Sequence, residues 1–313
     1  MIAFGSSISG GEAYRRYAQP GIRLASEPDS VNFAYAAVEP IGRTYNLILD
    51  AAARREDLEA LVLVHPHTEI VDPGFCAKVR TALEPDNVGM VGWAGATGVR
   101  SIAWWEGEVT AAPAIHRYEE HGGGDIPSLS WTRLAAPPAE VECLDGQLLV
   151  LSPWAVRTLR FDEGLLLGHG FDLDFSLQVR AAGRRLMVAD LRLAHHRSLE
   201  LVADLDVWVQ AHIHLAEKWS GTLDDRDADE AAWKQRARRA EARREAARAY
   251  AVSQALILDA RVMELERALA EKTGSPSWRV TAPLRTLNRI RREAADRRGT
   301  NGAGPGAGGR RWD

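Results

Sequence analysis

The sequence predicts an α/β domain with a mostly parallel central sheet, followed by a helical tail. Short apolar runs bounded by turn residues, which are typical of buried strands, alternate with stretches whose apolar residues recur at helical spacing. Charge also divides the chain, because residues 222–313 contain 20 Lys and Arg against 14 Asp and Glu, whereas residues 1–221 are acidic. Of the 313 residues, 46% are hydrophobic, which allows a sizeable core.

Individual elements follow from these runs. We expect strands at Ile2–Ser7, Ile22–Ser26, Leu58–Val64, Val88–Gly92 and Arg185–Asp190, further apolar stretches at Val31–Glu39 and Val141–Leu151, and helices at Gly10–Ala18, Gly42–Arg54, Asp72–Leu83 and Asp172–Ala182. Asp72 is expected to cap its helix, with Pro73 at the first helical position. Residues 94–140 are irregular and rich in Gly and Pro, which is typical of functional loops, so we place substrate specificity there.

The expected topology predicts where a ligand binds. In open parallel sheets the binding site lies at the carboxyl ends of the strands. Polar residues follow several of the expected strands. We therefore expect one edge of the sheet to hold Ser6, Ser7, Glu27, Asp29 and the segment after Val64.

The chain is expected to divide into five parts. These are a globular domain at 1–220, a linker at 221–229, a long helix at 230–273, a basic amphipathic segment at 274–298 and a disordered tail at 299–313. Apolar residues in the long helix alternate in steps of four and three, the a/d pattern of a coiled coil: Ala251, Ala255, Leu258, Val262, Leu265 and Leu269. This pattern predicts a homo-oligomer formed through the helix.

Composition also bears on location and partners. The basic segment at 274–298 carries Trp278 among arginines, which suits an anionic membrane surface, and a partner-docking or solvated helix is an equally good interpretation. The two cysteines, Cys76 and Cys143, form no disulfide or zinc pattern, and no signal peptide or membrane span is recognisable. We expect a cytoplasmic protein, either free or peripheral at the inner face of the membrane. An acidic body argues against nucleic-acid binding.

Acidic and histidine residues cluster at four places in the globular domain. They are His65-Pro66-His67-Thr68-Glu69, Asp145-Gly146, the segment with Asp162, Glu163, Asp172 and Asp174, and His195-His196. Carboxylates, with histidine as an additional ligand, suit a hard divalent cation, and a carboxylate can also deprotonate a hydroxyl nucleophile. Each cluster has a simpler interpretation, since Asp-Gly is typical of turns, Asp172 of a helix cap and a His pair of a loop.

The order of these clusters resembles glycosyltransferase family 2, and within it the StrF-like domain, from Ser26 to about Trp219. Tyr45-Asn46 matches the family's Tyr-Asn, Leu144-Asp145-Gly146 its Asp-Gly, Phe161-Asp162-Glu163 its Phe-Asp-Glu, Phe171-Asp172-Leu173-Asp174 its aromatic-Asp-x-Asp, and His195 or His196 with Ser198 its His-x-Ser. In the tail, the segment 275–285 is similar to one that follows coiled coils in bacterial surface-glycan glycosyltransferases.

The resemblance implies a GT-A fold for residues 1–220, a nucleotide-diphosphate sugar donor and a Mn²⁺ or Mg²⁺ ion. It implies that Asp172 or Asp174 is the acceptor-side base, with Asp172 preferred. It further implies nucleotide-sugar binding by Ser6, Glu27, Tyr45, Asn46, Asp145 and Gly146, and contact of His195 and His196 with the metal or the diphosphate.

One position departs from the family pattern. The family's metal-binding Asp after the central strand falls at His67. Three explanations stay open: His67 binds the ion itself, Glu69 supplies the carboxylate, or metal binding is weak or lost. Imidazole is a poor ligand for Mg²⁺ and an acceptable one for Mn²⁺, so the sequence favours Mn²⁺.

The sequence therefore predicts an inverting glycosyltransferase that transfers a sugar to a glycan or lipid-linked acceptor, in bacterial surface polysaccharide or secondary-metabolite glycan synthesis. The alternative, which His67 keeps open, is a catalytically inactive GT-A-like scaffold that organises glycan-synthesis enzymes through its coiled coil.

Overall fold

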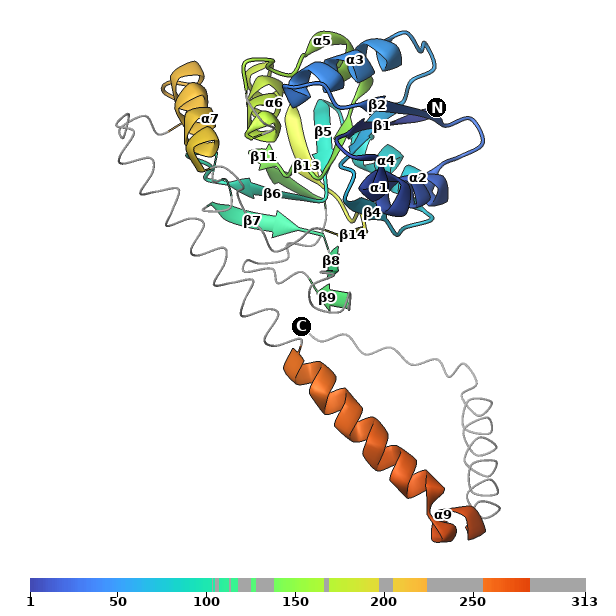
Figure 1. The fold of residues 1–313 in the computed structure, drawn as a ribbon. Coiled ribbons are helices and arrows are strands. Elements are labelled where there is room, and N and C mark those ends of the chain that lie inside the picture. Colours follow the sequence, from blue (N-terminus) through green and yellow to red (C-terminus); the bar gives the residue numbers. More distant parts are fainter. Residues whose placement is uncertain are drawn as a thin grey trace, which may run out of the picture. The chain divides into compact units, whose positions relative to one another are not determined.

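The computed structural model describes most of the first 223 residues and one helical segment of the tail. The described residues are 1–102, 104, 107–112, 114–117, 125–127, 138–165, 169–196, 205–223 and 256–281. The chain separates into two compact units, Met1–Val252 and Ser253–Asp313. The candidate site lies in the first unit, whose strands and helices are drawn in Figure 1.

A seven-stranded sheet forms the centre of the first unit. Its order is β10 (Ala139–Val141), β13 (Arg185–Val188), β5 (Val88–Gly92), β12 (Leu148–Leu151), β3 (Ala60–Val64), β1 (Ile2–Ile8) and β2 (Val31–Ala36). All of these strands run in one direction except β12, which is antiparallel to β3 and β5, and β10, which is antiparallel to β13. The predicted mostly parallel sheet is therefore confirmed.

Two small sheets extend from the central one. The first consists of β11 (Cys143–Leu144), β6 (Ala94–Thr97) and β7 (Glu108–Ala111), and the second of β4 (Thr68–Ile70), β14 (Leu193–His195), β8 (Ala114–Arg117) and β9 (Asp125–Pro127). The described parts of the irregular segment 94–140 supply strands to both sheets. In the second sheet, His195 pairs with Thr68, so two histidine-containing segments far apart in sequence become neighbours.

Helices cover both faces of the central sheet (Figure 1). One core cluster joins the sheet to α3 (Ile41–Ala53), α5 (Pro153–Thr158), α6 (Phe171–Ala181) and α7 (Leu205–Lys218), and the other joins it to α2 (Gln19–Ala25) and α4 (Phe75–Leu83). Alternate residues of β3 enter opposite clusters: Leu61 and Leu63 face one, and Val62 and Val64 the other. This two-sided burial explains why the strand is a continuous apolar run.

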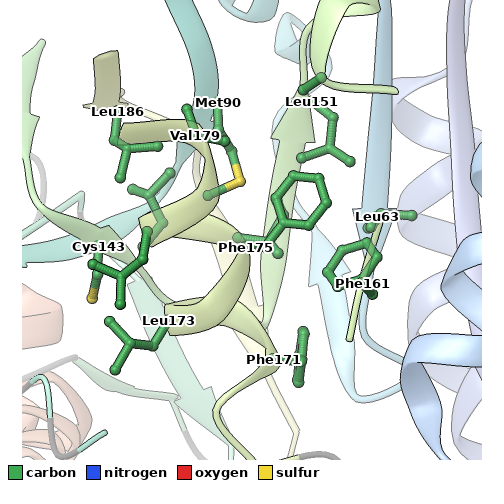
Figure 2. Packing of buried hydrophobic residues seen from close by; sticks show 14 of the residues in the cluster. Leu63, Met90, Cys143, Leu151, Phe161, Phe171, Leu173, Phe175, Val179 and Leu186 are labelled. Carbon is green, nitrogen blue, oxygen red and sulfur yellow. The ribbon is translucent and has the colours of Figure 1, made fainter. Parts of the chain in front are cut away.

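The α6 face carries the aromatic part of the core. Figure 2 shows Phe175 of α6 among Met90, Leu151 and Phe161, and the rings of Phe161 and Phe175 stack with centroids 4.3 Å apart. This packing fixes the position of α6, and the predicted base, Asp172, is in the first turn of that helix.

The expectation of a strand at Ile22–Ser26 is wrong. The chain is helical from α1 (Gly11–Ala13) through the π-helical turn Tyr14–Ala18 to the end of α2 at Ala25. Ala18, Ile22 and Ala25 are buried and recur at helical spacing, so the apolar run faces the core as a helix and not as a strand. The second strand of the chain is β2, within the apolar stretch at Val31–Glu39.

The other described elements follow the expected order, with shifted ends. The helix predicted from Asp72 begins at Phe75, with Gly74 as its cap, and Asp72 accepts a hydrogen bond from the Gly74 backbone N–H at 2.9 Å. Pro73 is therefore outside the helix. The strand expected at Arg185–Asp190 ends at Val188.

The second unit contains a helix at residues 256–274, followed by α9 (Pro276–Val280). Residues 256–273 of this helix fall in the range expected for the long helix, and the helix ends one residue later. Residues 224–255 and 282–313, which include most of the linker and of the basic segment and all of the tail, lie outside the described residues. Of the helices in the described residues, none is both long and apolar enough to cross a bilayer.

Candidate functional site

Polar residues meet at the carboxyl edge of the central sheet, where β1 and β3 end and β12 begins. The Ser6 hydroxyl, which is fully buried, donates a hydrogen bond to the Val64 carbonyl oxygen at 2.9 Å. Next along the chain, the His65 backbone N–H donates to the Gln147 carbonyl oxygen at 3.0 Å. Two of the predicted segments therefore share one edge, which is the geometry expected from a parallel sheet.

The Asp145-Gly146 segment is a tight turn at this edge. Oδ1 of Asp145 accepts from the Gln147 backbone N–H at 2.9 Å and from Nε1 of Trp93 at 3.2 Å. The first bond is the Asx-type contact of an ordinary turn. The second joins the turn to the residue that follows β5, so the carboxylate is held by two parts of the edge.

Asp172 reaches this turn from the first helical turn of α6. Its Oδ2 accepts from the Gly146 backbone N–H at 3.0 Å, and its Oδ1 accepts from the Leu173 N–H at 2.9 Å. The helix cap is Gly170 at φ 76°, so Asp172 lies inside the helix and is not its capping residue. An added Cβ at Gly146 would lie 2.6 Å from the Phe171 ring, which explains why glycine suits this close approach.

The environment of Asp172 favours its protonated form. Burial, and next the nearby charge of Asp145, raise the pKa of Asp172 to about 7, against the lowering effect of the backbone N–H groups of Leu173, Gly146 and Asp172 itself. A carboxyl group that titrates near neutrality can take up a proton during a reaction at physiological pH.

Asp174, the other candidate base, is occupied in the core. It is fully buried, and it accepts from Nε1 of Trp219 at 2.8 Å and from Nε2 of Gln178 at 2.8 Å. The Lys218 ammonium lies 2.8 Å from the same carboxylate and 2.6 Å from that of Asp162. Asp174 therefore ties α6 to the C-terminal end of α7.

Asp162 shares the Lys218 ammonium with Asp174. Burial opposes ionisation of its carboxyl, but hydrogen bonds from Lys218, from the Gly164 N–H and from His214 outweigh this and lower its pKa to about 2. Asp162 is ionised at neutral pH and pairs with Lys218, which keeps α7 against the Phe161-Asp162-Glu163 segment.

The histidines after β3 and β14 form a separate group at the second small sheet. Nδ1 of His67 lies 2.7 Å from the His196 carbonyl oxygen, and Nε2 of His196 lies 2.7 Å from Oε2 of Glu69. The Tyr17 ring stacks on His196, with centroids 3.9 Å apart and planes 8° from parallel. Because a carbonyl oxygen only accepts, Nδ1 of His67 is the donor in its contact with His196.

The four residues expected to bind a metal do not form one ligand set. Within the described residues, no group of three or more His, Cys, Asp or Glu side chains is arranged to hold a metal ion. His196 and Glu69 are paired with each other, and His195 is buried within β14. The described residues therefore do not fit a complete metal site.

Tyr45 and Asn46, two of the residues expected to bind the nucleotide sugar, contact the segment that contains Phe161. Tyr45 is buried in the core against Phe161 and Phe171, and Asn46 clamps the backbone of Phe161, donating to its carbonyl oxygen and accepting from its N–H. Both residues hold the segment that leads to α6.

Glu27 is at the opposite edge of the sheet. Since the segment before it is helical, Glu27 precedes β2 instead of following a strand, and its carboxylate makes two bonds to Arg80, at 2.8 and 2.6 Å. A hollow of about 520 Å³ at this edge is lined by Arg80, Glu59 and neighbouring residues of β3 and α4. The expected place of Glu27 beside Ser6 is therefore wrong, and the hollow lies away from Asp172.

Sequence reasoning missed Trp93 and Tyr17. Trp93 directly follows β5, so the rule that selected Ser6 and His65 could also have selected it. Tyr17 stands in a π-helical turn, and no sequence signal marks its stacking partner, which is 179 positions away.

Comparisons with known proteins agree with the motif order. A family model described as "Glycosyltransferase like family" matches residues 27–219. The "Streptomycin biosynthesis protein StrF" of Streptomyces griseus is 32% identical over 205 residues, which span 63% of this chain and 66%, just under two thirds, of that protein.

Solved structures are more distant. GalNAc-T7 with UDP, GalNAc and Mn²⁺ superposes with a TM-score of 0.45 at 13% identity, covering 71% of this chain and 48% of the other. The mannosyltransferase PcManGT from Pyrobaculum calidifontis, in complex with GDP-Man and Mn²⁺, gives 0.42 at 11% identity, covering 91% and 83%. Because both TM-scores are below 0.5, neither likeness bears on the chemistry of this chain.

Proposed function

This chain belongs to the glycosyltransferase-like family whose model matches residues 27–219, and on that premise we propose that it transfers a sugar from a nucleotide-diphosphate donor. The observation that carries the proposal is Asp172: a carboxylate at the carboxyl edge of the sheet, held by the Gly146 and Leu173 N–H groups, with a pKa of about 7.

In the proposed reaction, Asp172 is the general base. It takes the proton of the acceptor hydroxyl as that oxygen bonds to the anomeric carbon, while the bond from that carbon to the diphosphate oxygen breaks. Attack and departure occur on opposite faces of the sugar, so the anomeric centre is inverted. Burial keeps the pKa of this base high, and Asp145 adds to this because its negative charge opposes a second negative charge nearby.

The donor and the biosynthetic role are proposed only as classes. The family membership supports a nucleotide-diphosphate sugar as donor, and the name of the Streptomyces griseus relative supports secondary-metabolite glycan synthesis over surface polysaccharide. A membrane role of residues 274–298 stays a prediction from the sequence, because most of that range lies outside the described residues.

The decisive test begins with donor identification. A thermal-shift screen of UDP-, GDP- and dTDP-sugars, each with Mn²⁺, Mg²⁺ or a chelator, selects the donor and its metal requirement. Asp172→Asn should then abolish transfer while leaving the donor-induced shift in Tm intact, because a base acts on the acceptor. Glu140→Gln removes an exposed carboxylate of β10 and serves as control. Equal loss of transfer and donor binding in Asp172→Asn contradicts the assigned role.

A second candidate is the inactive scaffold. The observation in its favour is that the described residues, with His67 at the family's Asp position, contain no complete metal-ligand set. If no nucleotide sugar raises Tm and none is hydrolysed with or without Mn²⁺, the scaffold replaces the transferase.

A further inference from the structure

The helix at residues 256–274 exposes a stripe of large aliphatic side chains. Leu258, Val262, Leu265 and Leu269 are between 51% and 64% exposed, and they recur in steps of four, three and four. Residues at this spacing lie along one seam of a helix, where they form the a and d positions of heptads. Burying such a stripe against a second helix is the usual reason for its presence.

We propose that this seam pairs with the same seam of a second copy of the chain, in a parallel two-stranded coiled coil. This proposal depends on the exposed stripe of the helix and not on the role of Asp172.

The types of residue along the seam favour two strands. Val262 is at an a position between two leucines at d, Leu258 and Leu265. A β-branched residue at a with leucine at d is the combination that favours parallel dimers over trimers and tetramers. The seam extends in sequence to Ala255 and Ala251, outside the described residues, and ends before Lys272, which occupies the next d position.

The flanking charges favour the parallel orientation. Arg261 is at a g position, and Asp259 and Glu266 are at e positions. In a parallel pair, g of one helix faces the following e of the other, so Arg261 faces Glu266. In an antiparallel pair, e positions face each other, and the acids Asp259 and Glu266 would be opposed. Within one copy, Arg261 forms an exposed ion pair with Glu264, which a more favourable interhelical partner can replace.

Other exposed apolar residues on the helix do not continue the stripe. Leu256, Ile257 and Met263 lie at b and c positions, and the later b and c positions are Glu264, Ala270 and Glu271. Met263 is 61% exposed, which is similar to the 55% of Leu265, and it stands two positions away. The two residues therefore provide a matched pair for a substitution test.

The experiment is sedimentation of the full chain over a range of concentrations. The wild type should shift from the mass of the 34.4 kDa chain to twice that mass as concentration rises. Leu265→Lys should remain monomeric at concentrations where Met263→Lys and the wild type are dimers. Because both substituted side chains are exposed, neither change should unfold the protein, which circular dichroism checks.

Orientation is tested with a cysteine. Leu258→Cys should form an interchain disulfide on mild oxidation, because a d position meets its own copy only in the parallel arrangement; the native Cys76 and Cys143 are buried. A wild type that stays monomeric, a dimer that survives Leu265→Lys, or a Leu258→Cys dimer that fails to crosslink would each overturn the proposal. None of these results depends on transferase activity, so the two proposals fail separately.

Discussion

Replacing Asp172 with Asn should stabilise the first unit increasingly as the pH rises. The side chain is held at a pKa of about 7 in the folded chain, whereas the ordinary value is 3.8. The folded state therefore keeps a proton between these pH values that the unfolded state releases. Stability from the neutral carboxyl is present at low pH and is lost as the pH rises through 7.

The magnitude follows from the size of the shift. Each pKa unit corresponds to 1.36 kcal/mol, so a shift of about three units costs about 4 kcal/mol of unfolding free energy once Asp172 is fully ionised. Between pH 5 and pH 8 the expected loss is about 2.5 kcal/mol. Asn carries no charge, so Asp172→Asn does not undergo this loss.

The assay is denaturant unfolding followed by tryptophan fluorescence at several pH values from 5 to 8. The Asn variant also places an amide group beside one of the two N–H donors, which adds a penalty, but that penalty is independent of pH. The stability difference between Asp172→Asn and the wild type should therefore grow by about 2.5 kcal/mol in favour of the variant over this range.

A control separates this effect from general pH dependence. Glu140→Gln removes a carboxylate that is 56% exposed, and its stability curve should run parallel to that of the wild type. If the unfolding free energy of Asp172→Asn changes with pH as that of the wild type does, the folded chain does not raise the pKa of Asp172. The argument that Asp172 can act as a base near neutral pH would then fail.

Two further variants test the surroundings of Asp172. Lys218→Met should lower the unfolding free energy by about 3 kcal/mol, measured by denaturant, because Asp162 and Asp174 lose their common cation while remaining largely buried. Gly146→Ala should abolish turnover of the identified donor and retain a folded circular dichroism spectrum, because an added Cβ would press on the Phe171 ring and displace the adjacent carboxylate.

Each of these variants has a counterpart. Arg185→Met removes the exposed ion pair with Glu140 and should lower the unfolding free energy by less than about 1 kcal/mol. If Lys218→Met lowers it by no more than this, burial does not strengthen the ion pairs of Lys218. Gly74→Ala adds a Cβ that meets only one atom at an ordinary 3.4 Å, and it should keep full activity. If Gly146→Ala retains turnover, the close approach of Gly146 to Phe171 is not needed for activity.

Several elements could be predicted because their signal is local. The run at Ala60–Val64 is apolar throughout, which is typical of a strand buried on both faces. The helix Ile41–Ala53 was recognisable from spacing, since its buried residues recur every three or four positions. The run at Ile22–Ser26 was ambiguous, because three apolar residues among five fit a strand and a helix equally well.

The candidate site could be predicted only in part. Asp172, Asp145 and His67 stand where the chain leaves or enters a core element, and this follows from local pattern together with the order of motifs. Glu27 was misplaced because the run before it is a helix and not a strand. For Tyr45, a motif match reports only that a residue recurs in a family, and the same match arises from a packing role or a binding role.

By itself, the sequence determined the α/β architecture, the family and the acidic segment from which a base would come. Tertiary structure gave Asp172 and Asp174 different surroundings: residues two apart on a helix point in nearly opposite directions, and only the position of α7 makes one of them a buried ion-pair partner and leaves the other at the Gly146 turn. It also decided that His196 meets Glu69 across 127 positions. Contacts of this kind depend on how sheets and helices pack, and no short stretch of chain contains that information.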